Sequence, residues 1–252
     1  MYSMSTALKI ENLNKTFPEA RRPLTLFQAL KRKIFENGRN GKNFFALSEI
    51  NLCIEKGEKI GIVGNNGAGK TTLLKMISGL SRPTTGSISS EGSIVFLAGL
   101  GIGMIEELSV RENIFLYGTI YGVEREKIQQ EFAEIIHWAE LEHFVEAKLR
   151  TLSLGMKSRL AFSIARHIPG DIFLWDEALS AGDRNFQIKC EVFFKKAKEK
   201  DHTFIIASHN LTFIEKFCHK ALWLQKGRQI AFGDTAEVLN QYRASTSAAG
   251  QR

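Results

Sequence analysis

The chain has no long hydrophobic run and few cysteine or proline residues. Its 252 residues include three cysteines and four prolines. No apolar stretch approaches the roughly 18 to 20 residues that cross a bilayer. The N-terminal segment MYSMSTALKI lacks the basic start and hydrophobic centre of a signal peptide. Cys53, Cys190 and Cys218 are scattered and odd in number, which predicts neither a disulfide framework nor a zinc site. We therefore expect a soluble, cytoplasmic protein.

The net charge of +7 is concentrated in one short segment rather than spread along the chain. Residues 21–42 contain one acidic residue, Glu36, against seven basic residues: Arg21, Arg22, Lys31, Arg32, Lys33, Arg39 and Lys42. A protein that binds duplex nucleic acid needs a basic surface wide enough to meet many phosphates. One short insertion does not supply that surface, so we expect no nucleic-acid partner.

Strand-like and helix-like segments alternate along the chain. Residues 8–17 and 46–54 alternate apolar and polar residues, as edge strands do, and KIGIVG is a short apolar run followed by the amphipathic segment KTTLLKMISG. Residues 109–167 are mostly helical in pattern, and strand-like runs return at IFLW, TFIIAS, KALWLQ and RQIAFG. This order predicts an α/β fold with a parallel, helix-covered sheet and a helical subdomain inserted in its middle.

The same pattern predicts one domain over residues 1–244 and a disordered tail over residues 245–252. Its core would comprise about residues 1–98 and 170–233, with the helical subdomain at about 99–169 and the basic insertion at 21–42. The small polar residues of the tail are typical of disorder.

The loop GNNGAGKTT fits the phosphate-binding pattern G-x-x-x-x-G-K-[ST] at Gly64, Gly69, Lys70 and Thr71. Its glycines let backbone N–H groups turn towards phosphate oxygens, and the following helix directs its positive end at the same anion. Lys70 would neutralise the β- and γ-phosphates, and Thr71 would give its hydroxyl to Mg²⁺. An ordinary glycine-rich turn is the alternative. The candidate nucleotide-binding residues are Asn65, Asn66, Gly67, Ala68, Gly69, Lys70, Thr71 and Thr72.

Two adjacent carboxylates, Asp176 and Glu177, follow the apolar run IFLW. Like charges raise one another's pKa, so the pair is unfavourable unless a cation lies beside it. Mg²⁺ carried by the nucleotide supplies that cation, with Asp176 and Thr71 as its ligands. Glu177 is then free to orient or deprotonate the attacking water. An exposed acidic pair at a strand end is the alternative.

These motifs together resemble the nucleotide-binding subunit of ABC transporters. They are joined by TLSLGMKSRLAFSIARH, by the turn Ala181-Gly182-Asp183, and by IIASHN around His209. The usual signature, Leu-Ser-Gly-Gly-Gln, is altered here at Leu154 and Met156. This form is similar to the branch that exports bacterial surface polysaccharides: O-antigen, capsule or teichoic acid. The resemblance implies a P-loop NTPase fold of the ABC ATPase type, with a RecA-like parallel core and an antiparallel β edge.

The resemblance also implies site residues beyond the phosphate loop. Two copies of the chain would pack head to tail, so that Ser153, Gly155 and Met156 close over the partner's ATP and Asp183 lies in the turn between them. A plain N-cap is the alternative for Ser153. His209 would contact the γ-phosphate as the switch histidine. Phe17 would stack on adenine, with Phe44 and Phe45 as rivals and core packing as the alternative for all three.

One feature of the family is absent from the sequence. The glutamine expected after SIVFL is replaced by AGLGIGM, residues 98–104. The polysaccharide branch is also glycine-rich here. Glu106 and Glu107 are candidate replacements, although surface exposure is the simpler explanation for both.

The resemblance implies a peripheral ATPase subunit on the cytoplasmic face of the inner membrane. It would use ATP and Mg²⁺, form a homodimer under an integral-membrane permease, and power export of a lipid-linked polysaccharide. The alternative is a soluble ABC ATPase that acts on nucleic acid or ribosomes. Within the insertion, Leu26, Phe27, Leu30 and Ile34 recur at helical spacing. We hypothesise a short amphipathic helix that faces the membrane, with a solvated loop as the alternative.

Overall fold

The computed structural model describes residues 5–18, 43–98, 104–176, 184–198 and 201–249. The basic insertion at 21–42, most of the segment that replaces the expected glutamine, and the candidates Glu177 and Asp183 lie outside the described residues. Within the described parts of the chain, no helix is long and apolar enough to span a membrane.

The described strands form one nine-stranded sheet in the order β4-β1-β2-β9-β8-β3-β7-β6-β5. Five of them make the parallel core: β5 (Ile94–Ala98), β6 (Ile172–Asp176), β7 (Thr203–Ala207), β3 (Lys59–Val63) and β8 (Lys220–Gln225). Every residue of β3 and β7 is buried. Their apolar runs are therefore continuous rather than alternating, as expected for strands that are covered on both faces.

The other four strands form the antiparallel edge: β1 (Thr6–Pro18), β2 (Asn43–Glu55), β4 (Thr85–Ser90) and β9 (Arg228–Asp234). Strand β1 pairs antiparallel with both β2 and β4, and β9 pairs antiparallel with β8, whereas β2 meets β9 through a parallel bridge between Ser48 and Arg228. The predicted strands are confirmed. The sequence analysis missed β4. Five of the six residues in TGSISS are exposed and only one is apolar, so the segment shows neither the alternating pattern of a strand nor the apolar spacing of a helix.

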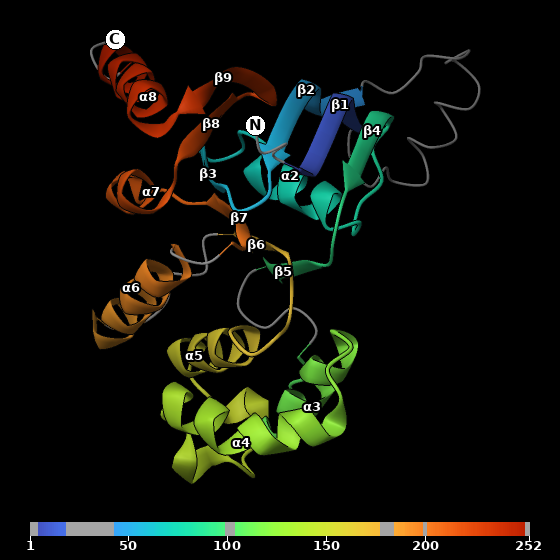
Figure 1. The fold of residues 1–252 in the computed structure, drawn as a ribbon, viewed down its shortest axis with the longest axis vertical. Coiled ribbons are helices and arrows are strands. Elements are labelled where there is room, and N and C mark those ends of the chain that lie inside the picture. The colour runs from blue at the N-terminus through green and yellow to red at the C-terminus, as the bar shows by residue number, and fades with distance from the viewer. Residues whose placement is uncertain (1–4, 19–42, 99–103, 177–183, 199–200, 250–252) are drawn as a thin grey trace, which may run out of the picture.

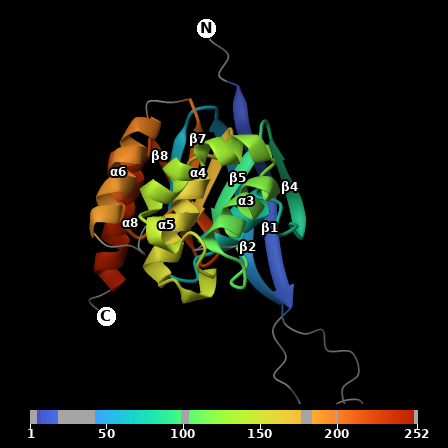
Figure 2. The same cartoon turned by 90° about the horizontal axis from the view of Figure 1, so that it is seen from below.

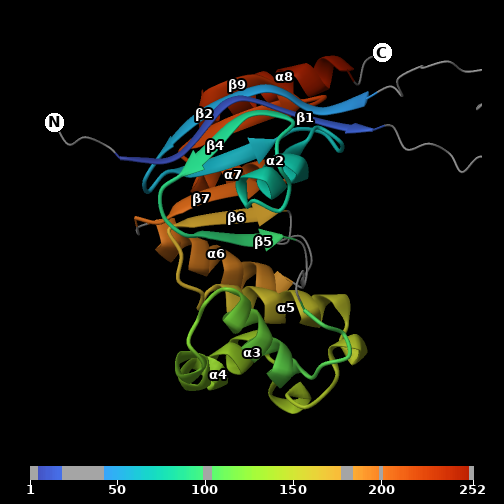
Figure 3. The same ribbon diagram turned by 90° about the vertical axis from the view of Figure 1, so that its right-hand side faces the viewer.

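Three helices form the inserted subdomain between β5 and β6: α3 (Val110–Ile120), α4 (Arg125–Ala139) and α5 (Leu154–Ala165). Two 3₁₀ turns, η1 (Glu142–Phe144) and η2 (Leu149–Thr151), join α4 to α5. Helix α3 begins at a capping box in which Ser109 and Glu112 each satisfy the other's backbone N–H. Figures 1 and 3 show these helices together at one end of the molecule, beyond β5. The predicted helical insertion is confirmed.

The core helices cover both faces of the parallel sheet. Helix α2 (Lys70–Ile77) lies in an apolar cluster between the core strands and β1 and β2. The opposite face carries α6 (Arg184–Lys198), α7 (Leu211–Phe217) and α8 (Thr235–Ala249). Figure 2 shows α6 and α8 on one side of the molecule and β1, β2 and β4 on the other. Along β6 the side chains alternate between the two clusters, with Leu174 facing the α2 side and Trp175 facing α6.

The expected disorder of residues 245–252 is corrected by the structure as far as Ala249. Helix α8 continues to that residue. The Ser245 hydroxyl donates to the backbone oxygen of Tyr242 at 2.7 Å, and the Thr246 hydroxyl donates to that of Arg243 at 2.9 Å. These hydroxyl groups bond back to the preceding turn of the helix, and the neighbouring alanines favour helix.

Candidate functional site

The loop between β3 and α2 has the shape of a phosphate cradle. Three of its glycines have positive φ: 149° at Gly64, 77° at Gly67 and 105° at Gly69, which caps α2. A Cβ atom at Gly64 would lie 2.2 Å from the Leu224 backbone oxygen, and one at Gly69 would lie 2.9 Å from the Ala46 backbone oxygen. Only glycine therefore fits at these two positions. The predicted order of strand, glycine-rich loop and helix is confirmed.

Lys70 lies under this loop and connects it with the loop after β7. The residue is 7% exposed, and its Nζ atom donates to the Gly64 backbone oxygen at 2.7 Å. The same Nζ atom is 3.4 Å from the Asn65 backbone oxygen and 3.4 Å from Nε2 of His209. Because an ammonium group can only donate, this contact requires His209 to carry its proton on Nδ1. The structure thus brings together two residues that the sequence separates widely.

Asp176 is half-buried at the carboxyl end of β6, where it pairs in register with Ala207 of β7. Since β3, β6 and β7 are parallel neighbours, the phosphate loop, Asp176 and His209 all follow strand ends at one edge of the sheet. Ligands of open α/β sheets bind at this edge.

The donor set at this edge fits a nucleotide that brings Mg²⁺. Thr71 is exposed on the first turn of α2, and its hydroxyl together with the Asp176 carboxylate offers the hard oxygen ligands that Mg²⁺ prefers. The described residues contain no group of three or more histidine, cysteine, aspartate or glutamate side chains that could hold a metal alone. Phosphate oxygens and water would therefore complete the coordination.

A cavity of about 250 Å³ opens at the phosphate loop, and an aromatic residue lies at its edge. The lining residues are Phe44, Ala46, Asn66, Gly67, Ala68, Gly69, Lys70, Thr71 and Thr72. Phe44 is 61% exposed and lines the cavity, whereas Phe17 and Phe45 do not. Phe17 pairs with Phe44 across the two strands, and the Lys15 ammonium lies 4.9 Å from its ring centre. The geometry therefore favours Phe44, which the sequence analysis placed behind Phe17, as the aromatic residue next to the nucleotide.

The signature residues Ser153, Gly155 and Met156 lie at the start of α5. The Ser153 hydroxyl accepts a hydrogen bond from the Met156 backbone N–H at 3.3 Å, so Ser153 is the N-cap of the helix. The capping role considered for this serine is confirmed. Ser153 is exposed, and Leu154 is 64% exposed. None of the three signature residues lines the cavity at the phosphate loop of its own chain.

Glu106 and Glu107 form ion pairs at the surface of the helical subdomain. Glu106 accepts from Nζ of Lys157 in α5 at 2.7 Å, and this bond holds the pKa of Glu106 below its usual value. Glu107 lies 3.5 Å from the Arg150 guanidinium. The carboxylate side chains are 64% and 66% exposed. Surface exposure, the simpler explanation of the two residues, agrees with these values.

Sequence reasoning missed one contact of the phosphate loop. The Tyr242 hydroxyl in α8 donates to Oδ1 of Asn65 at 3.0 Å. The two residues are 177 positions apart, and Tyr242 belongs to no motif that would mark it. Only the packing of α8 beside β8 brings the tyrosine to the loop.

Comparison with known proteins agrees with this site. The family described as ABC transporter matches residues 47–180. The O-antigen export system ATP-binding protein RfbB of Klebsiella pneumoniae is 34% identical over 88% of this chain and 86% of its own length. The teichoic acids export ATP-binding protein TagH of Bacillus anthracis is 38% identical over 95% of this chain. The chain spans only 43% of the length of that second relative.

Solved structures share the fold. A structure described as an ATP-binding subunit of an ABC transporter superposes with a TM-score of 0.74 at 21% identity, covering 94% of this chain and 93% of its own. A dimeric ATP-binding cassette bound to ADP and phosphate gives a TM-score of 0.73 at 24% identity, covering 90% of this chain and 98% of its own. These likenesses confirm the predicted P-loop fold of the ABC ATPase type. From its family match and the extent of its likeness to the O-antigen relative, the chain belongs to the ABC transporter family.

Proposed function

We propose that this chain binds and hydrolyses ATP with Mg²⁺. The observation that carries the proposal is the meeting of Lys70 and His209, whose Nζ and Nε2 atoms are 3.4 Å apart under a glycine-bounded phosphate loop. Backbone N–H groups of the loop and the N-terminus of α2 would hold the phosphates. Lys70 would exchange its bond to the Gly64 oxygen for a phosphate oxygen, and His209 would contact the γ-phosphate.

Asp176 and Thr71 would hold the metal, and Glu177 would position the attacking water. When bound, Mg²⁺ would neutralise negative charge on the phosphates. The Asp176 carboxylate lies at the end of a rigid buried strand, so its position is fixed before the nucleotide arrives. Glu177 follows Asp176 directly in sequence and would bring a second carboxylate to the same strand end. Phe44 would contact the adenine ring.

We infer further that the ATPase works as a homodimer with two composite sites. The chain contains two helix N-termini suited to anions, at α2 and at α5, and the second is exposed beside Ser153 and Gly155. Ser153, Gly155 and Met156 of one copy would close over the ATP of the other, with Asp183 in the turn between the two copies. The dimeric, ADP-bound state of one structural neighbour supports this arrangement. Residues 1–244 would form the single ATPase domain of each copy.

The function that these features support best is energising export of a lipid-linked surface polysaccharide. Relatives at 34% and 38% identity are the ATP-binding subunits of O-antigen and teichoic acid export systems. The chain would act peripherally on the cytoplasmic face of the inner membrane, under an integral-membrane permease. The relatives favour this function over action on nucleic acid or ribosomes.

The test is complementation in a strain that lacks the gene. The wild-type chain should restore polysaccharide to the cell surface, whereas Lys70→Ala should leave the polymer inside the cell. The purified chain should show ATPase activity that a membrane fraction containing the permease changes. Stimulation by DNA or ribosomes, with no response to the membrane fraction, would refute the transport function while leaving the ATPase assignment in place.

A further inference from the structure

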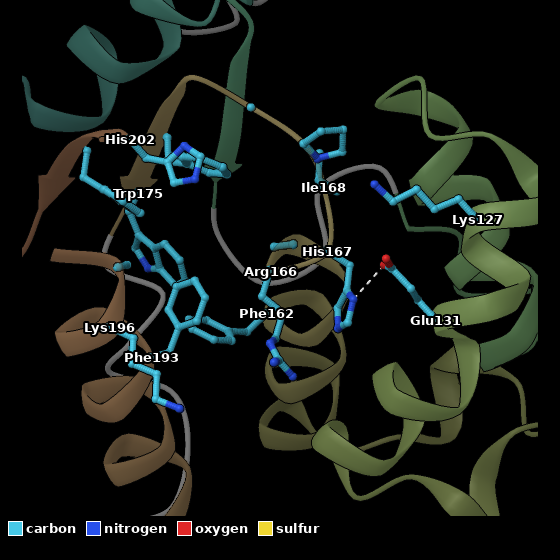
Figure 4. A pocket seen from close by; sticks show the side chains of 16 residues that line it. Lys127, Glu131, Phe162, Arg166, His167, Ile168, Trp175, Phe193, Lys196 and His202 are labelled. Carbon is cyan, nitrogen blue, oxygen red and sulfur yellow. Dashed lines mark hydrogen bonds and ion pairs between the residues drawn. The ribbon is translucent and has the colours of Figure 1, made fainter. Parts of the chain in front are cut away.

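A second cavity lies where the helical subdomain meets the core, away from the phosphate loop. It has a volume of about 420 Å³ and shares no lining residue with the cavity at that loop. Its walls come from α4 and α5 on one side and from β6, β7 and α6 on the other (Figure 4). This volume is within the range of about 300 to 1,000 Å³ that is typical of small-molecule sites.

Aromatic side chains form the apolar part of this junction cavity. They are Phe162, Phe173, Trp175, Phe193 and Phe204. The rings pack against one another, with centroids 4.7 Å apart for Phe162 and Trp175 and 5.1 Å apart for Phe173 and Phe204. The packing makes the wall rigid, and a flat or extended apolar group would bury area against it.

Positive charge lines the same cavity. Lys127 approaches from α4 and Lys196 from α6, on opposite sides (Figure 4). Among the described residues that line the cavity, Glu131 is the one carboxylate, and it is bound to Nδ1 of His167 at 2.7 Å. The nearby Glu134 carboxylate is bound to the Arg166 guanidinium at 3.0 Å. Lys127, Lys196 and the Arg166 guanidinium therefore outnumber the one carboxylate among these lining residues.

Two donor nitrogen atoms of the lining residues are buried without a hydrogen-bond partner: Arg166 Nη1 and Trp175 Nε1. The last belongs to a residue that is only 3% exposed. A buried N–H group without an acceptor costs about 1 to 3 kcal/mol, so native proteins seldom leave one unsatisfied. Donors gathered at one cavity indicate a ligand that carries acceptor oxygens.

We propose that this cavity binds a small amphiphilic anion, with an apolar body against the aromatic wall and one carboxylate or phosphate group between Lys127 and Lys196. The anion fits the uncompensated charge, and the apolar body fits the rings. A neutral molecule would leave the net positive charge of the lining residues unbalanced. A cation would be repelled.

The cavity contacts two elements that carry residues of the proposed ATPase site, helix α5 and strand β6. Helix α5 begins at Ser153 and reaches the cavity with Phe162, Ala165 and Arg166 near its other end. Trp175 lines the cavity and directly precedes Asp176. A bound ligand would therefore tie α5 to β6 and change the rate of ATP hydrolysis. This regulatory consequence rests on the proposed function, whereas binding itself does not.

The binding test uses 2-naphthoate as the probe and the neutral 2-naphthalenemethanol as its matched analogue. Isothermal titration of the full chain should show saturable binding of the naphthoate at one site and weaker binding of the alcohol. Lys127→Gln combined with Lys196→Gln should weaken naphthoate binding about fivefold, as expected for the loss of two exposed charge contacts. Lys148→Gln combined with Lys195→Gln makes the same change of charge outside the cavity and should leave binding unchanged.

A second variant tests the apolar wall independently of charge. Ala197 is 5% exposed and lines the cavity, so Ala197→Leu should fill part of the space and abolish binding while the thermal unfolding transition stays cooperative. The proposal is overturned if naphthoate shows no saturable binding, or if Lys127→Gln with Lys196→Gln binds it as the wild type does. Binding that is lost in Lys70→Ala but kept in that double variant would place the probe at the phosphate loop instead, and would also overturn it.

Discussion

The hydroxyl group of Tyr242 donates a hydrogen bond to the side chain of Asn65, and so connects helix α8 to the phosphate loop at 3.0 Å. The Tyr242 ring is held edge-on against Trp223 of β8, with centroids 5.7 Å apart. The backbone oxygen of Asn65 is 3.4 Å from Nζ of Lys70. Asn65 is thus held at its side chain by Tyr242 and at its backbone oxygen by Lys70.

Tyr242→Phe should therefore weaken nucleotide binding without changing the chemical step. The ring would keep its packing on Trp223, and only the hydrogen bond to Asn65 would be lost. A net loss of about 0.5 to 1.5 kcal/mol corresponds to about a two- to tenfold rise in KM for ATP, with kcat nearly unchanged. Arg243→Gln, which breaks the neighbouring ion pair with Glu215, is the control and should keep the wild-type KM. An unchanged KM in Tyr242→Phe would contradict a positioning role.

Ser153→Asp separates the capping role of this serine from its proposed role across the dimer. Aspartate caps helices about as well as serine, so thermal stability should stay within about 0.5 kcal/mol of the wild type. Its negative charge would face the partner's γ-phosphate, so dimers formed with ATP in the absence of Mg²⁺ should disappear on a sizing column. Ser153→Arg should also prevent dimerisation and, because it removes the cap, should cost about 1 kcal/mol of stability. Dimers that persist in both variants would argue against a composite site.

Glu177→Gln and Lys70→Ala should fail in different ways. The glutamine variant keeps Asp176 at the metal site, so it should bind ATP normally, nearly stop turnover, and accumulate as a nucleotide-bound dimer. Lys70→Ala should lose affinity for the nucleotide itself, because the ammonium under the loop is removed. Titration with a fluorescent ATP analogue, together with a phosphate-release assay, distinguishes the two. Hydrolysis by Glu177→Gln at the wild-type rate would refute the role given to this glutamate.

Asp171 should make part of the stability depend on acid pH. Its Oδ2 atom accepts from the Ser93 backbone N–H at 2.7 Å and from the Ser93 hydroxyl at 2.8 Å, and these bonds lower the pKa of the carboxyl group. The unfolded chain therefore binds this proton more readily. The contribution is complete above the unfolded value of 3.8 and is lost as the pH falls through the lower folded value.

Thermal unfolding of wild type and Asp171→Asn over a pH series measures this contribution. The difference in Tm should be constant near neutrality and should shrink below about pH 4, where the carboxyl group of the unfolded chain begins to take up a proton. Ser93→Ala removes one of the two donors and should reduce the same difference. A difference in Tm that stays constant down to the acid limit of folding would contradict the assignment.

The sequence predicted the core of the fold well because buried parallel strands are continuous apolar runs, and because a phosphate loop has a fixed spacing. It also singled out Lys70, Asp176 and His209, which the structure places after parallel strands that end on the same side. The sequence did not predict the features that depend on tertiary contacts. The exposed strand β4 has no apolar pattern, and the small polar residues at the end of α8 continue the helix although their composition is typical of a tail.

Two features of the site depend on packing that the sequence pattern does not show. Phe17 and Phe44 are paired across β1 and β2, and their order in the sequence does not tell which ring lies beside the loop. Tyr242 reaches Asn65 only because α8 packs against β8, a contact that no local spacing encodes. Local patterns therefore identify candidate residues for the chemistry, whereas the residues that support them depend on packing.

The basic insertion at residues 21–42 stays a prediction from the sequence, and its role can be tested separately from ATP hydrolysis. Replacing Lys31, Arg32 and Lys33 by glutamine removes three of its seven basic residues and leaves the phosphate loop and the strand ends unchanged. Each basic residue near an anionic membrane contributes about 1 kcal/mol, so the variant should bind membranes more weakly. The ATPase rate of the purified chain should stay at the wild-type value, while polysaccharide export or recovery with the membrane fraction should fall. Replacing Lys148, Arg150 and Lys226 by glutamine gives the same change of net charge elsewhere on the surface. This control variant should leave polysaccharide export and membrane recovery unchanged. Normal export with normal membrane recovery in the Lys31, Arg32 and Lys33 variant would assign the insertion to a solvated loop.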